Sequence, residues 1–156
     1  MRTLLASLLL LPVLALAAAT TQDLEGRWLV DADATWAMME ENPHLKAQFG
    51  AMPTEQQAAI RSMVMEKMAK VGWNLSAGRA AIIGPDGALR TSTWTVSQTE
   101  GETLSIEATD DQGHSTTGSV TIAGDRLIAR GFANPTKGQG DTALVMTRDT
   151  AGGAEK

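Results

Sequence analysis

The second half of the chain alternates apolar and polar residues with a period of two, and this pattern constrains the fold more than any other feature. In the segment 88–97, Trp94 and Val96 fall on one face and Thr93 and Thr95 on the other. Successive side chains of a β-strand point to opposite faces, so the alternation indicates half-buried strands. The predicted strands are Trp73–Ala77, Arg79–Ile83, Ala88–Ser97, Thr103–Thr109, Ser115–Ile122, Arg126–Phe132 and Thr142–Arg148.

Short turn sequences connect these strands and indicate how they pair. Pro85-Asp86-Gly87 and Ala123-Gly124-Asp125 have the residues of tight turns, and strands joined so closely must be antiparallel neighbours. Gly26–Asp31 adds an eighth strand, while 73–77 and 79–83 can also be read as one bulged strand. We therefore expect a mainly β fold of about eight antiparallel strands, either an up-and-down barrel or a strongly curved sheet. Closure of the barrel would remove exposed edges.

A helical insertion is predicted over 33–71, between the first strand and the others. Asp33 is placed to cap a helix over 34–41, and Pro43 can begin a further turn. Thr54 starts a Thr-x-x-Gln capping box for a longer helix. The apolar stripe of that helix comprises Ile60, Met63, Val64, Met68 and Val71.

The N-terminal residues have the features of a secretory signal peptide. Arg2 precedes an apolar run that ends at Leu16 and is followed by three alanines. The pattern predicts a signal peptide over 1–19, with a cut two residues earlier as the alternative. We expect a single domain over 20–148, a disordered tail over 149–156 and no membrane span in the mature chain.

The composition indicates the cellular compartment and makes some classes of partner unfavourable. The chain has no cysteine, so disulfides do not hold it together, and a periplasmic location is favoured over a disulfide-rich extracellular one. Thirteen Lys and Arg residues against eighteen Asp and Glu give a net charge of −5. Without a basic cluster, nucleic acids and anionic lipid surfaces are poor partners.

A second pattern relates the first and last strands of the predicted barrel. Gly26-Arg27-Trp28 stands at the head of the first strand, and Arg148 lies on the last. A Gly-x-Trp on the first strand with a basic residue on the last resembles lipocalin-like (calycin-type) barrels. The resemblance implies a structural floor in which Arg148 packs across the ring of Trp28, and Gly26 permits close approach.

The chain departs from that family in two respects. A long helical insertion follows the first strand, where the family has a loop, and the family's helix after the barrel is missing. The chain is also similar to small uncharacterised secreted bacterial proteins, which imply no activity. Ligand binding is therefore an expectation drawn from the resemblance in fold.

The leading functional hypothesis is non-catalytic binding of a small, largely apolar ligand inside the barrel. Trp94, Trp36 and Met39 are the expected contacts, with Trp36 acting as a lid residue over one mouth. On this hypothesis Trp36→Ala is tolerated and changes binding. Trp28→Ala is instead expected to damage stability.

Two alternatives involve the methionine-rich helix. It could make the protein an interaction module for an envelope partner, such as an inhibitor or assembly factor. Thioethers together with His44 could also bind Cu(I), although helical spacing places Met63 and Met65 on different sides and favours core packing of the stripe. We therefore predict no metal site.

The sequence has few of the side chains and motifs that catalysis commonly uses, so we predict no enzyme and no cofactor. The chain lacks Cys and Tyr, and its two histidines are His44 and His114. There is no Gly-x-Ser-x-Gly elbow and no phosphate-binding loop. The acidic run Asp110-Asp111 before His114 is predicted to be a hairpin turn.

Overall fold

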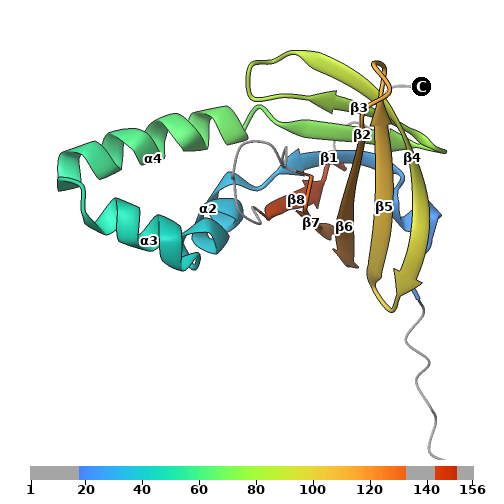
Figure 1. Ribbon diagram of the computed structural model, residues 1–156, viewed down its shortest axis with the longest axis horizontal. Helices are drawn as coiled ribbons and strands as arrows, with labels where there is room; N and C mark the ends of the chain where they lie inside the picture. The colour runs from blue at the N-terminus through green and yellow to red at the C-terminus, as the bar shows by residue number, and fades with distance from the viewer. Residues whose placement is uncertain (1–17, 133–142, 151–156) are drawn as a thin grey trace, which may run out of the picture.

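The computed structural model describes residues 18–132 and 143–150 and shows a closed antiparallel barrel of eight strands in sequence order (Figure 1). The strands are β1 (Gly26–Val30), β2 (Gly72–Ser76), β3 (Arg79–Ile83), β4 (Leu89–Glu100), β5 (Thr103–Asp110), β6 (Ser115–Ala123), β7 (Arg126–Arg130) and β8 (Leu144–Arg148). The first strand pairs with the last, with Trp28 opposite Arg148, so the sheet has no free edge. The predicted fold class is confirmed, and the closed barrel replaces the open alternative.

Most of the expected strand boundaries agree with the structure to within a few residues. β2 and β3 are separate strands, because Ser76 lies opposite Arg79 across a two-residue turn. β4 extends past the expected end and contains an irregularity in its register between Val96 and Gln98. Thr142, most of the predicted leader and most of the predicted tail lie outside the described residues.

One end of the barrel is solid. The largest fully buried side chains there, which we call the floor, are Leu24, Trp28, Leu104, Val120, Leu127 and Met146. Leu24 belongs to α1 (Thr21–Leu24), a short helix before β1 that the sequence analysis did not predict. The floor residues are at most 1% exposed, so this half of the barrel is packed like a protein interior.

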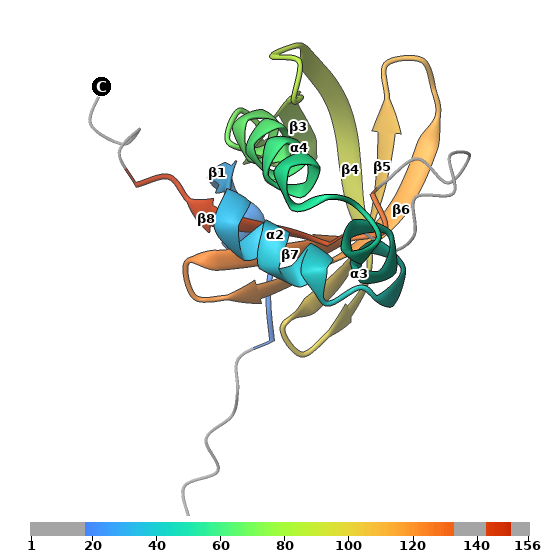
Figure 2. The same ribbon diagram turned by 90° about the vertical axis from the view of Figure 1, so that its left-hand side faces the viewer.

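Three helices lie at the opposite end, which we call the mouth. They are α2 (Ala32–Glu40), α3 (Pro43–Gly50) and α4 (Thr54–Met68), and together they form the helical arm. The arm projects from the barrel in Figure 1 and faces the viewer in Figure 2. Because α1 precedes β1 and α2 follows it, floor and mouth are opposite ends of the same strand. No helix in the described part of the chain is long and apolar enough to cross a membrane.

Both predicted helix caps are wrong. Asp31, not Asp33, caps α2, because its carboxylate follows β1 directly and accepts a hydrogen bond from the Ala34 amide at 2.9 Å. Pro53 is the residue before α4, and Thr54 makes no capping bond. The Gln57 side chain, expected to complete that box, donates instead to the Met52 carbonyl oxygen at 2.8 Å.

The arm is attached to the barrel by a buried hydroxyl. Thr35 is fully buried, donates to the Val145 carbonyl oxygen at 3.2 Å and accepts from the Val145 amide at 2.9 Å. The predicted apolar stripe is wrong at one position: Met63 is 51% exposed, whereas Met65 and Met68 pack toward the core. The helix is nearly uniform in hydrophobicity around its axis, so the sequence pattern did not define its buried face.

Candidate functional site

The barrel contains a cavity of about 490 Å³ at its mouth. Apolar side chains make up most of its wall, among them Trp73, Leu75, Ile82, Trp94, Ile106 and Phe132. None of the floor residues lines it. Sites for small molecules are typically concave, mostly apolar and of this size.

The size of the inward-facing side chains explains why space remains here. Ala80, Ala108 and Ala129 come from three different strands and all line the cavity. At the floor the inward positions of β6 and β7 carry larger side chains, such as Val120 and Leu127. The methyl groups of these alanines are too small to meet across an eight-stranded barrel. The mouth is therefore hollow, whereas the floor is filled.

Trp94 is a fixed part of the cavity wall. It is 6% exposed, and its Nε1 donates to the Arg79 carbonyl oxygen at 3.0 Å. Ser92, two residues earlier and on the same face of β4, also lines the cavity. The Ser92 hydroxyl is buried and has no hydrogen-bond partner among the described residues. A buried hydroxyl without a hydrogen-bond partner lowers the stability of the folded state, unless another molecule forms a hydrogen bond with it.

Trp73 and Phe132 form an edge-on aromatic pair within the cavity wall. Their ring centroids lie 5.6 Å apart and their planes meet at 81°, a favourable T-shaped arrangement. The Phe132 ring lies against Gly118 of β6, where an added Cβ would be 2.7 Å from Phe132 Cε2. Any larger residue at this position would therefore displace the ring.

The sequence analysis named neither Trp73 nor Phe132 as a ligand contact. Trp73 alternates with Leu75 on β2, which would have indicated an inward side chain. Phe132 lies just beyond β7 and has no local pattern that predicts its direction.

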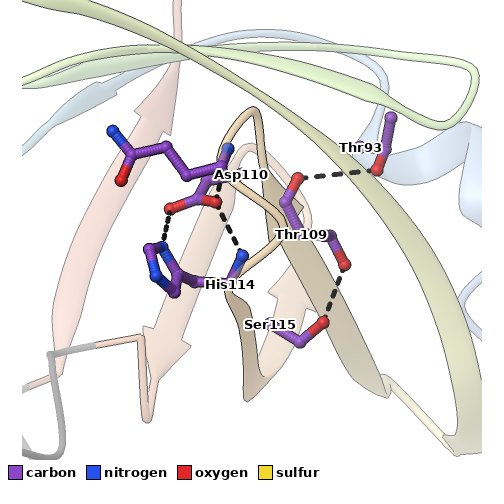
Figure 3. A network of polar contacts seen from close by, with 6 residues as sticks. Thr93, Thr109, Asp110, His114 and Ser115 are labelled. Atoms are coloured by element: carbon purple, nitrogen blue, oxygen red, sulfur yellow. Dashed lines mark hydrogen bonds and ion pairs between the residues drawn. The ribbon is translucent and has the colours of Figure 1, made fainter.

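A polar network borders the cavity at the β5–β6 turn (Figure 3). The Asp110 carboxylate accepts from the Gln112 and His114 amides at 2.9 and 2.8 Å, and the His114 ring nitrogen Nδ1 lies 3.1 Å from Asp110 Oδ2. The hydrogen bond from the His114 amide is the largest cause that lowers the pKa of Asp110. This segment is the hairpin turn that the sequence predicted.

The rim also carries one arginine of the cavity lining, Arg90, which pairs with Asp86 at 3.5 Å. Both side chains are exposed, so solvent weakens this pair. Within residues 18–132 and 143–150, no three His, Asp or Glu side chains are grouped so that they could hold a metal ion.

Two of the expected ligand contacts lie at the cavity and the third does not. Met39 and Trp94 line it. Trp36 lies outside the lining, 4% exposed, in a T-shaped pair with Phe49 at 5.3 Å and with the Arg61 guanidinium 5.8 Å from its ring centre. It packs the arm instead of covering the mouth.

This position reverses the expected effect of truncating Trp36. Removing a buried aromatic side chain leaves a cavity, so we expect Trp36→Ala to lower the free energy of unfolding by about 3–5 kcal/mol. Chemical denaturation followed by circular dichroism would measure the loss. A variant as stable as the parent would support the original expectation of an exposed lid.

At the floor, Trp28 and Arg148 lie together, as the resemblance implies. The Arg148 guanidinium lies 4.3 Å from the centre of the Trp28 ring. It donates to the carbonyl oxygens of Glu25 and Asp23, each at 2.6 Å. Stacking and charge-assisted hydrogen bonds thus hold the residues around α1 against the barrel.

Gly26 and the indole nitrogen complete this arrangement. Trp28 Nε1 donates to the Leu24 carbonyl oxygen at 2.7 Å, which satisfies its buried donor. Gly26 has a φ of +126°, and a Cβ there would lie 2.8 Å from Arg148 Nη1. A glycine is therefore required by both the backbone conformation and the close approach of the guanidinium.

Comparisons of the chain with protein-family models, with curated proteins and with solved structures give no match. The closed eight-stranded barrel is consistent with a lipocalin-like fold, and no relative adds an activity to it.

Proposed function

We propose that this protein is a secreted, non-catalytic binding protein that holds a small, largely apolar ligand in the cavity at the mouth. The observation that supports the proposal is the cavity of about 490 Å³ bordered by Trp73, Trp94 and Phe132. An empty apolar cavity costs stability, and a ligand that fills it restores the lost contacts.

A relationship to lipocalin-like barrels is part of the same proposal. It is supported by the closed barrel and by the contacts among Gly26, Trp28 and Arg148 at its floor. Export to the periplasm or beyond is proposed from the leader-like N-terminal sequence and from the absence of cysteine.

The test is a tryptophan fluorescence titration of the purified protein with a panel of small hydrophobic compounds. Binding should shift or quench the emission, because two of the four tryptophans border the cavity. Trp94→Phe should reduce the change, since it removes a reporter in the wall. Trp36→Phe is the matched control and should leave the change intact, because Trp36 lies outside the cavity lining.

Two results would contradict the proposal. A spectrum that stays silent across a broad panel, with no rise in melting temperature, would argue against ligand binding. A change that survives Trp94→Phe and disappears in Trp36→Phe would move the site to the arm.

The exposed face of the arm supports a second candidate, a protein-interaction module. No residue of α3 is buried, and Met63 on α4 is half exposed. Met65 is partly buried and Glu66 pairs with Lys70 at 2.9 Å, so Met63 is the better residue to test. Met63→Glu should abolish capture of an envelope partner by the purified protein, while Lys70→Gln should not. Retention of the partner by Met63→Glu would count against this candidate.

A further inference from the structure

The cavity does not run along the whole barrel. Its lining comes from β2 to β8 and from the arm, and no residue of β1 contributes. Trp28, Leu104 and the other floor residues do not line it, and each is at most 1% exposed. The space is therefore confined to the mouth half of the barrel.

The Trp73–Phe132 pair, which we call the aromatic crossbar, spans this space. β2 carries Trp73, and β6 carries Gly118, against which the Phe132 ring lies. In a ring of eight strands, β2 and β6 are four strands apart in either direction and so face each other. With centroids 5.6 Å apart, the two rings meet across the lumen.

The crossbar also determines which surfaces a ligand would contact. Trp73 and Phe132 present rings at 81° to each other, and Trp94 adds a third aromatic side chain to the wall. Ring systems bind well against such edges and faces, because offset and T-shaped contacts add to the energy of burial. A linear alkyl chain has no aromatic ring and cannot make these contacts.

From the filled floor below the cavity and from the crossbar we infer that the ligand is a compact ring compound, such as a fused bicyclic aromatic, and not a linear alkyl chain. This inference rests on the proposed binding function. Phe132 is the residue that determines the specificity, because its ring meets Trp73 edge-on and is one of the aromatic surfaces that a ligand in the cavity would contact.

The test compares 2-naphthol with 1-decanol by calorimetric titration of the purified protein. Each compound has ten carbons and one hydroxyl, but 2-naphthol is a rigid aromatic ring system and 1-decanol is a flexible and more hydrophobic chain. Burial of apolar surface alone therefore favours 1-decanol, and tighter binding of 2-naphthol would report the ring contacts. We expect 2-naphthol to bind at least about tenfold more tightly than 1-decanol.

Phe132→Leu keeps an apolar side chain and removes the aromatic ring of the crossbar. The affinity for 2-naphthol should fall about tenfold, and that for 1-decanol should stay equal or rise. Phe49→Leu is the matched control, because Phe49 makes the other T-shaped pair with a tryptophan, at 5.3 Å, outside the cavity lining. It should leave both affinities unchanged.

The outcomes separate this inference from the proposed function. If 1-decanol binds as tightly as 2-naphthol or more so, ligand binding stands and the ring preference is wrong. If 2-naphthol is preferred but Phe132→Leu and Phe49→Leu behave alike, the role of the crossbar is wrong. If neither compound binds, the inference is overturned, and the fluorescence titration with the broad panel decides whether the proposed function falls with it.

Discussion

The floor and the mouth are opposite ends of the same strands. They differ in the size of the side chains that point into the barrel. At the floor, large side chains such as Trp28 and Met146 are fully buried, and Arg148 holds α1 in place. At the mouth, Ala80 and Ala108 occupy comparable inward positions and leave a cavity. The filled floor stabilises the fold and the mouth holds an open cavity, so on the proposed function substitutions at the two ends should affect stability and ligand binding separately.

The largest effect should come from the floor. Trp28→Ala removes a fully buried indole together with its stacking on Arg148, and we expect the free energy of unfolding to fall by about 3–5 kcal/mol. Equilibrium denaturation in urea would measure it. A loss below about 1 kcal/mol would mean that the floor is not the stable end.

Larger side chains introduced at the floor and at the mouth should have different effects. Val120→Leu inserts a methylene into a fully buried position of the floor and should cost about 1–3 kcal/mol. Ala108→Leu adds more atoms, yet at the cavity it should change stability by less than about 0.5 kcal/mol and abolish ligand binding. Thermal denaturation with and without ligand tests both variants. Equal losses at the two sites would show that the mouth is also tightly packed.

A smaller effect is expected at the unpaired hydroxyl of the cavity wall. Ser92→Ala removes a buried group without a partner among the described residues, so stability should stay equal or rise by up to about 1 kcal/mol. The melting temperature would report the change. A clear loss of stability would indicate that the Ser92 hydroxyl is hydrogen-bonded in solution.

The smallest effect concerns the exposed turn at the rim. Because hydrogen bonds from the His114 and Gln112 amides lower the pKa of Asp110, its ionised form stabilises the folded state. That contribution is present above the ordinary carboxyl pKa, about 4, and is lost as the pH falls through the lowered value. Asp110→Asn should therefore be slightly less stable than the parent at pH 7, and the difference should close at acidic pH. A difference that grows on acidification would contradict this assignment.

Much of the barrel could be predicted because its determinants are local. Alternation in segments such as 88–97 defines strands, and turn residues such as Asp86 make neighbouring strands antiparallel. The floor was predictable for a different reason. The resemblance to lipocalin-like barrels implied that Arg148 packs across the ring of Trp28, and the guanidinium lies 4.3 Å from the ring centre.

The arm and the cavity wall were harder to predict. Met63 is exposed and Trp36 is buried, opposite to their expected places, because the helices of the arm have no strongly apolar side. Which face of such a helix becomes buried depends on its neighbours. The inward direction of Phe132 depends on Gly118, which belongs to another strand and is not adjacent in the sequence.

The strands and their antiparallel order can be read from the sequence, since they depend on side-chain periodicity and short turns. The pairing of β1 with β8 and the hollow mouth are visible only in the folded chain. The reason is physical: closure and empty volume depend on distances across the barrel. Those distances follow from the number and tilt of the strands, and side chains such as Trp73 and Phe132 come together only when the sheet is closed.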